Sequence, residues 1–210
     1  MPRQPRVVAV GAPHHITQRG NNRIPVFRSD ADRLFYLDTL RRKARDHGLA
    51  VLGWCLMPNH VHLVAVPSRA DSLARALGET HRLHAQRFNR LYRRSGHLWQ
   101  NRFYSCPLGD AHLLEALAYV DLNPVRARLA DRAEAYRWSS AAAHIVHADP
   151  HELLDDWIWS DIDRGHDWRD LLASRPLSAT AARALRYATR HGRPLGDDLA
   201  VAKAVAHSAS

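Results

Sequence analysis

The hydrophobic pattern of residues 60–66, HVHLVAV, predicts a β-strand with two different faces. Successive side chains of a strand point to opposite faces, so one face carries the alternate residues His60, His62, Val64 and Val66. The apolar run 49–57, LAVLGWCLM, predicts a second strand, and Pro58-Asn59 between the two runs predicts a tight turn. We therefore expect a hairpin whose second strand begins with two histidines, about 6–7 Å apart along one face.

Other patterns predict the remaining elements. The run 14–20, HHITQRG, predicts a first strand, and Ser29 is a typical N-cap for a helix that ends near Gly48. In that helix four apolar residues recur at helical spacing: Leu34, Leu37, Leu40 and Ala44. Further patterns predict a helix over 72–94, a strand over 102–108, and a helix over 111–122 that Asp110 caps and Asn123-Pro124 ends.

The order of these elements, β-α-β-β-α-β, defines the expected fold class. It is α+β, with the ferredoxin-like split βαβ arrangement, an antiparallel sheet backed by helices. The pattern changes beyond about Ser140, and residues 178–192 and 197–208 predict two helical stretches around the turn GRPLG. We therefore expect a main domain over residues 1–145 and a C-terminal helical extension over residues 146–210.

Composition and charge narrow the class of partner. Hydrophobic residues make up 46% of the 210 residues, which is enough for a globular core. Thirty Lys and Arg against twenty-one Asp and Glu give a net charge of +9, which favours nucleic acid as partner, with a merely basic globular protein as the alternative. The N-terminus lacks the apolar run of a signal peptide and no eighteen consecutive residues are apolar, so we expect a cytoplasmic protein without a membrane partner.

Two pairs of residues carry candidate chemistry. His60 and His62 can converge on one metal ion, although a strand pair of this kind is often structural. Tyr119 and Asn123 are spaced four apart on the predicted helix and share a face, although a helical Tyr is usually a packing residue and an Asn before Pro usually a C-cap. Together the two pairs suit cleavage of a phosphodiester, which needs a nucleophile, a Lewis acid and positive side chains.

Several stretches make the sequence resemble a known family. MPNHVHLV with EALAYVDLNPVRARL resembles the HUH single-tyrosine transposases (His, hydrophobe, His), and among them most of all the REP-associated tyrosine transposases. Other stretches carry the resemblance in matching order along nearly the whole chain: HHITQRGNNRIPVF, LGWCLMPNHVHLV, SGHLWQNRFYS, AYVDLNPVRA, YRWSSAAAH and GRPLGDD. The resemblance implies a ferredoxin-like fold and makes residues 1–145 the catalytic domain.

The resemblance also implies a mechanism and a substrate. It implies a divalent metal, Mg²⁺ or Mn²⁺, held by His60 and His62, with Asn123 where related insertion-sequence transposases place a Gln as third ligand. It implies that Tyr119 cleaves and rejoins single-stranded DNA through a 5′-phosphotyrosine intermediate. The implied substrate is a palindromic DNA hairpin, the REP element, with an adjoining single-stranded tetranucleotide. The implied state is a monomer, with a dimer as the alternative.

Seven residues are candidates for DNA binding. Arg3 and Arg6 lie on an N-terminal arm that suits contacts with phosphates or a groove. Three further arginines suit holding the hairpin or the cleaved strand: Arg19 and Arg23 beside the turn after the first strand, and Arg102 near the fourth strand. Trp99 and Tyr104 are candidates for stacking on unpaired bases, with core packing as the alternative for each.

Three other functions remain open at this point. Rolling-circle initiators and relaxases share the HUH chemistry, but they typically use a pair of tyrosines or a Lys soon after the Tyr, whereas Leu122 stands three residues after Tyr119. A catalytically retired hairpin-binding protein would keep the fold without the chemistry. A metal-dependent hydrolase with water as nucleophile would make Tyr119 dispensable.

Overall fold

The computed structural model describes residues 7–155, 160, 167–174 and 178–196. Within these ranges one sheet holds four strands, β1 (His14–Arg19), β2 (Leu49–Met57), β3 (His60–Pro67) and β4 (Tyr104–Pro107). Their spatial order is β2-β3-β1-β4, and every neighbouring pair is antiparallel. With the helices that connect the strands, this order confirms the predicted α+β class and its ferredoxin-like split βαβ arrangement.

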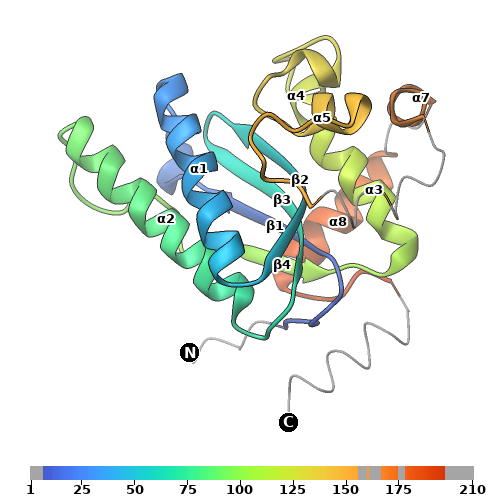
Figure 1. The fold of residues 1–210 in the computed structure, drawn as a ribbon, viewed down its shortest axis with the longest axis horizontal. Coiled ribbons are helices and arrows are strands. Elements are labelled where there is room, and N and C mark those ends of the chain that lie inside the picture. Colours follow the sequence, from blue (N-terminus) through green and yellow to red (C-terminus); the bar gives the residue numbers. More distant parts are fainter. Residues whose placement is uncertain (1–6, 156–159, 161–166, 175–177, 197–210) are drawn as a thin grey trace.

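Helices α1 (Asp30–Asp46) and α2 (Ser72–Leu91) pack side by side over one face of the sheet (Figure 1). Ser29 caps α1 as predicted, in a capping box with Asp32 that satisfies two backbone N–H groups. The apolar core under these helices contains the β3 residues that alternate with the histidines: Val61, Leu63 and Ala65. The alternation predicted for this strand is therefore confirmed on its apolar face.

The expectation that Leu34 belongs to the buried stripe of α1 is wrong. Leu34 is 47% exposed, whereas Tyr36, Leu37 and Leu40 are buried against α2 and the sheet. Tyr36 takes part because its ring packs edge-on against Phe27, 5.5 Å away between centroids, and its hydroxyl lies 3.0 Å from His81 Nε2. The buried face of α1 therefore includes the aromatic Tyr36 with its polar partner and differs from the face that the aliphatic residues alone predict.

The opposite face of the sheet carries the second helical layer. Helix α3 (Asp110–Asp121) packs on β2 and β3, and α8 (Ala179–His191) packs on β4 and β1. Shorter helices continue this layer: α4 (Asn123–Arg126), α5 (Ala141–Val146) and α7 (Trp168–Ser174). Two 3₁₀ turns also fall within the described ranges: η1 (Asn21–Arg23) and η2 (Ala133–Ala135). The face of β3 that begins with His60 therefore lies under α3 and α8 (Figure 1).

The third predicted helix differs from the structure at both ends. Asp110 is its first residue and Gly109 its N-cap, so the prediction that Asp110 caps it is wrong. Asn123-Pro124 does not end the helical backbone, because Pro124 takes the first turn of α4, where no helical N–H bond is needed. Two other elements are shorter than predicted: the helix 72–94 ends at residue 91, and the strand 102–108 spans 104–107.

The predicted helix over 178–192 is confirmed as α8. The Ser178 side chain caps it by accepting from the Ala181 N–H at 3.0 Å, and Gly192 ends it in the left-handed region with φ 64°. The predicted stretch 197–208 lies outside the described residues, as do Arg3 and Arg6. No helix within the described ranges combines the length and apolar character that a bilayer crossing requires.

Gly20, just after β1, is a packing constraint next to the start of β3. Its N–H donates to the Asn59 carbonyl oxygen at 2.8 Å, which ties the end of β1 to the β2–β3 turn. A Cβ at Gly20 would contact the carbonyl oxygen of Ile24 and would lie 2.8 Å from Val26 Cγ1. Only a residue without a side chain therefore allows η1 to fold back this closely.

We predict that Gly20→Ala destabilises the protein by about 1–3 kcal/mol, because the added Cβ overpacks the turn. The matched control is Gly78→Ala in α2, where nothing lies within 4 Å of an added Cβ and alanine favours the helix. Urea unfolding measures both, with a lower midpoint expected for the first variant and an equal or higher one for the second. A wild-type midpoint for Gly20→Ala would contradict the packing argument.

Candidate active site

A cavity of about 930 Å³, here called the active-site cavity, lies between β1, β3, the α3–α4 junction and α8. Its walls carry these residues: His15, Thr17, Arg19, Asn22, Arg23, His60, His62, Gln100, Tyr104, Tyr119, Asn123, Arg186, Tyr187, Thr189, Arg190 and His191. Four of these described lining residues are arginines and none is an aspartate or glutamate. The cavity is therefore an electrostatically positive environment that suits a phosphate group.

His60 and His62 both line this cavity from the start of β3, as the alternation predicts. In the ladder with β1, His60 is opposite Arg19 and His62 is opposite Thr17. The centroids of the two imidazole rings are 4.9 Å apart and the ring planes meet at 75°. This separation is shorter than the rise of two strand residues, so the rings converge on the same region of the cavity.

The Nδ1 atom of each histidine has a partner within the protein. His60 Nδ1 lies 2.6 Å from Asn59 Oδ1, while the Asn59 amide nitrogen donates to the Arg23 carbonyl oxygen at 3.3 Å. That donation fixes which amide atom faces the ring, so His60 Nδ1 is the donor. His62 Nδ1 lies 3.1 Å from His15 Nε2. Neither His60 nor His62 uses its Nε2 atom in a hydrogen bond with the described residues.

Burial keeps both rings neutral. Desolvation lowers the pKa of His60 to about 4, and the Arg19 guanidinium acts in the same direction. Desolvation also lowers the pKa of His62 well below its usual value, with His60 and His15 as further causes. A neutral imidazole keeps the lone pair that a metal ion binds, so both histidines are in the ligating form near neutral pH.

Tyr119, in the last turn of α3, presents its ring to the histidines. The centroid of its ring lies 5.6 Å from that of His62, edge-on, and the Arg126 guanidinium lies over the ring at 4.9 Å. The hydroxyl makes no hydrogen bond with the described residues. The amide nitrogen of Asn123 donates to the Tyr119 carbonyl at 2.8 Å, which turns the amide oxygen away from that carbonyl. The predicted four-residue spacing therefore brings both residues to one cavity wall.

The donor set fits a divalent cation with open positions. The described residues form no cluster of three or more His, Cys, Asp or Glu side chains that would hold a metal. The active-site cavity offers two neutral imidazoles instead, with the Asn123 amide on the same wall. Such a set leaves coordination positions for water or phosphate oxygens, unlike a closed structural zinc site with four protein ligands.

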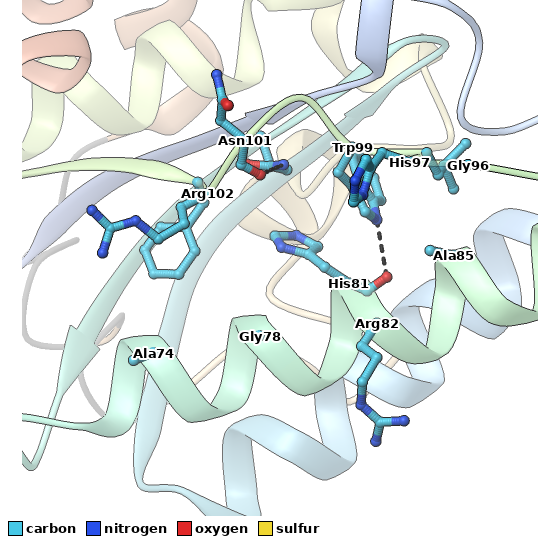
Figure 2. A pocket seen from close by; sticks show the side chains of 13 residues that line it. Ala74, Gly78, His81, Arg82, Ala85, Gly96, His97, Trp99, Asn101 and Arg102 are labelled. Atoms are coloured by element: carbon cyan, nitrogen blue, oxygen red, sulfur yellow. Dashed lines mark hydrogen bonds between the residues drawn. The ribbon is translucent and has the colours of Figure 1, made fainter. Parts of the chain in front are cut away.

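Of the seven predicted DNA-binding residues, the five that the structure describes divide between two cavities. Arg19, Arg23 and Tyr104 line the active-site cavity, and all three are exposed. Trp99 and Arg102 line a second cavity of about 460 Å³ between α2 and the segment 96–103 (Figure 2). The structure thus does not bring these two residues to Tyr119. Gln18 of β1 lines the second cavity, whereas its neighbours Thr17 and Arg19 line the active-site cavity, so the two cavities lie on opposite faces of the sheet.

Trp99 and Tyr104 differ in what they expose. Trp99 is buried, its ring centroid lies 4.8 Å from that of His81, and its Nε1 donates to the His81 carbonyl at 3.0 Å (dashed line in Figure 2). Tyr104 is 36% exposed at the start of β4. Core packing, the alternative for both aromatics, therefore accounts for Trp99, while Tyr104 keeps a free surface for a base.

The sequence pattern gave no sign of what α8 contributes. Arg186, Tyr187 and Arg190 are exposed on α8 and line the active-site cavity. The rings of Tyr187 and His191 contact each other, with centroids 4.1 Å apart and their planes tilted by 31°. An Arg-Tyr face at helical spacing is a usable signal for nucleic acid, but only once the helix is known to border the site.

Asp121 anchors the end of α3 just beyond the tyrosine. Its carboxylate is fully buried and accepts from Ser140 Oγ at 2.9 Å, His144 Nδ1 at 2.7 Å and Trp168 Nε1 at 2.9 Å. Three donors from α5, α7 and the residue before α5 thus meet one carboxylate. A buried carboxylate with this many partners fixes the end of α3, and with it the position of Tyr119.

One comparison with known proteins identifies a family, and another identifies a similar fold. The family model described as "Transposase IS200 like" matches residues 10–123. A solved structure of a REP-associated tyrosine transposase bound to a REP hairpin has a TM-score of 0.56 and 16% identity, and the match covers 74% of this chain and 92% of that chain. A likeness at this identity shows the fold.

A crystal structure of a protein from Deinococcus radiodurans R1, assigned as a transposase, has a TM-score of 0.40 and 23% identity. That match covers 57% of this chain and 95% of the other chain. No curated protein matches the sequence.

We predict that Asp121→Ala destabilises the protein by about 3–5 kcal/mol, because three buried donors lose their acceptor. The matched control, Asp131→Ala, removes an exposed carboxylate and should change the free energy of unfolding by less than about 0.5 kcal/mol. Equal unfolding midpoints for the two variants in urea would show that Asp121 does not anchor α3.

Proposed function

The chain belongs to the IS200-like transposase family, and we propose that it cleaves and rejoins single-stranded DNA at hairpin-forming palindromic repeats through a 5′-phosphotyrosine. One observation carries the proposal. The Tyr119 ring and two neutral histidines line one cavity whose described walls contain four arginines and no carboxylate. Such a site supplies a nucleophile and charge stabilisation for a phosphodiester.

In the proposed reaction the Tyr119 hydroxyl oxygen attacks the phosphorus of the DNA backbone. A bond between that oxygen and phosphorus forms, the bond from phosphorus to the 3′ oxygen breaks, the tyrosine proton passes to water, and the departing 3′ oxygen takes up a proton. The ring of His62 lies edge-on to the Tyr119 ring, which holds the attacking group at the cavity wall. Because the 5′-phosphotyrosine keeps the bond energy, a free 3′ hydroxyl can reverse the attack and rejoin the strand.

A divalent cation, Mg²⁺ or Mn²⁺, is part of the proposal. His60 and His62 would hold it through Nε2, and Asn123 through its amide oxygen, since these atoms are not used by the described protein groups. When bound, the ion neutralises charge on the phosphate oxygens. Imidazole nitrogen is a softer ligand than carboxylate oxygen, so we expect Mn²⁺ to bind more tightly than Mg²⁺.

The walls of the cavity support the proposed substrate. Four arginines border the groups proposed to react: Arg19 from the end of β1, Arg23 from η1, and Arg186 and Arg190 from α8. The exposed rings of Tyr104 and Tyr187 suit unpaired bases, which stack on aromatic side chains. The relative of similar fold was solved with a REP hairpin, which supports a hairpin as the double-stranded part of the substrate here.

The alternatives need other features. Metal-dependent hydrolysis would make Tyr119 dispensable, whereas the Tyr119 ring faces His62 at the wall of the cavity. A rolling-circle initiator would pair Tyr119 with a second tyrosine of the same helix, whereas Tyr104 and Tyr187 come from β4 and α8. A retired hairpin-binding protein would not need the proposed reacting groups to be together, whereas Tyr119, His60 and His62 line one cavity.

We further propose how the chain is organised around this reaction. Residues 1–145 carry the nucleophile and the three proposed metal ligands, and the extension 146–210 borders the site through α8. Since one chain supplies the whole set, a monomer that acts on its own substrate is preferred over a dimer that exchanges the tyrosine helix. We expect this monomer to act in the cytoplasm, where the DNA lies.

The test is capture of the covalent intermediate. Hairpin DNA with a single-stranded flank, labelled at its 3′ end, is incubated with Mn²⁺ and run on a denaturing protein gel. The wild type should retain the label only when the metal is present, and Tyr119→Phe should lose it, because the fragment with the 5′ phosphate stays on the tyrosine. Tyr104→Phe and Tyr187→Phe are the matched controls and should still form the adduct. Hairpin binding without any adduct would favour the retired binding protein.

We also predict that Arg19 and Arg23 contact phosphates. Replacing either residue with alanine should lower the slope of log affinity against log salt by about 1 and weaken hairpin binding for all sequences alike. Arg42→Ala, at an exposed position of α1 on the other side of the sheet, is the control and should leave the slope unchanged. Fluorescence anisotropy at several salt concentrations measures the slope, and unchanged slopes for Arg19 and Arg23 would refute the phosphate contacts.

A further inference from the structure

A chain of hydrogen bonds runs from α8 through β1 to the histidine pair. Thr189 Oγ1 on α8 lies 2.7 Å from His15 Nδ1, and His15 Nε2 lies 3.1 Å from His62 Nδ1. The rings of His15 and His62 stack with their planes 19° apart and their centroids 5.3 Å apart. Thr189 and His15 are 1% exposed and His62 is 5% exposed, so solvent cannot substitute for these partners.

Thr189 determines which atom donates and which accepts in each of these hydrogen bonds. Its hydroxyl donates to the Leu185 carbonyl one helical turn earlier, at 2.7 Å. A hydroxyl has one proton and two lone pairs, so Thr189 can only accept from its two other neighbours. These neighbours are His15 Nδ1 and the Cys106 thiol, whose sulfur lies 3.2 Å from the oxygen. Burial raises the pKa of Cys106 to about 11, so its thiol keeps the proton that it donates.

The donor at His15 then determines which nitrogen of His62 carries the proton. The His15 ring is 1% exposed, and its two hydrogen-bond partners are a hydroxyl and an imidazole, with no carboxylate to hold a second proton on it. His15 is therefore neutral, and since its Nδ1 donates to Thr189, its second nitrogen has no proton. His15 Nε2 is therefore an acceptor, and His62 Nδ1 must donate to it. His62 is left with a bare Nε2, the atom proposed to ligate the cation. If the Thr189 hydroxyl instead donated to His15 Nδ1, both hydrogen bonds would run in the opposite direction, and His62 would carry its proton on Nε2.

We propose that Thr189 and His15 are positioning residues that hold His62 in the tautomer whose Nε2 can bind a metal ion. The inference rests on the proposed function for its purpose, whereas the tautomer itself follows from the hydrogen bonds. His60 is set in the same form by Asn59, its neighbour in sequence. His62 instead depends on a helix that lies outside the matched region 10–123, which makes α8 part of the catalytic centre.

The tautomer can be read directly, without metal or DNA. Long-range ¹H–¹⁵N correlation spectra of the ¹⁵N-labelled full chain distinguish an Nδ1–H imidazole from an Nε2–H one, and the His62 signals are assigned by their loss in His62→Asn. The wild type should show His15 and His62 as Nδ1–H tautomers. An Nε2–H tautomer at His62 in the folded wild type would overturn the proposal, whatever the outcome of the adduct experiment.

Binding of Mn²⁺ alone, followed by electron paramagnetic resonance, tests the consequence. His15→Phe removes the acceptor and should weaken Mn²⁺ binding by about 10–100-fold. His15→Gln offers an amide oxygen in its place and should restore most of the affinity. Thr189→Val should weaken binding and Thr189→Ser should not, because only serine keeps the hydroxyl.

His14→Phe is the matched control for burial. His14 is as buried as His15, but it bonds to the backbone of Ala9 and Ala12 instead of the histidine pair, so Mn²⁺ binding should be unchanged. Wild-type affinity in a folded His15→Phe, or equal losses in His14→Phe and His15→Phe, would overturn the positioning role. An Nδ1–H tautomer at His62 in a wild type that binds no Mn²⁺ and forms no adduct would leave the hydrogen-bond chain standing and remove the proposed function.

Discussion

The antiparallel pairing of β1 with β3 is the constraint on which the whole site depends. Its register sets Thr17 opposite His62 and Arg19 opposite His60. This single register therefore fixes the relative positions of one arginine, two imidazoles and the neighbouring His15. A slip by one residue would move every histidine of β3 to the apolar face under α1 and α2. The hydrogen bond from the Gly20 N–H to the Asn59 carbonyl closes this ladder at the end that carries Arg19 and His60.

Local sequence patterns predicted those parts of the site whose residues are close in sequence. Strand alternation put His60 and His62 on one face, and helical spacing put Tyr119 and Asn123 on one wall, because each relation is fixed by backbone geometry within a few residues. Ser29 predicted the start of α1 because capping also depends on backbone geometry within a few residues. The order of helices and strands then sufficed for the fold class, since few topologies accommodate β-α-β-β-α-β.

What sequence reasoning could not supply depends on contacts between distant segments. Trp99 resembles a base-stacking residue in the sequence, but the His81 carbonyl and ring take up its surface. Leu34 fits the aliphatic spacing of α1, yet Tyr36 faces the core because Phe27 and His81 give it partners. The role of Thr189 is invisible in the stretch SATAARALRYATRHG, where it reads as one more small residue of an amphipathic helix. Such choices are made by tertiary packing, which local propensity does not encode.

The 174-residue separation between His15 and Thr189 has a consequence for how the site comes into being. The β2–β3 hairpin joins neighbours in the chain and closes only a short loop, whereas the docking of α8 on β1 and β4 closes nearly the whole chain. Contacts of such high sequence separation carry the largest loop-closure entropy and tend to form late in folding. His60 and His62 are therefore set on the sheet early, whereas the Nδ1–H form of His62 is completed only when α8 docks.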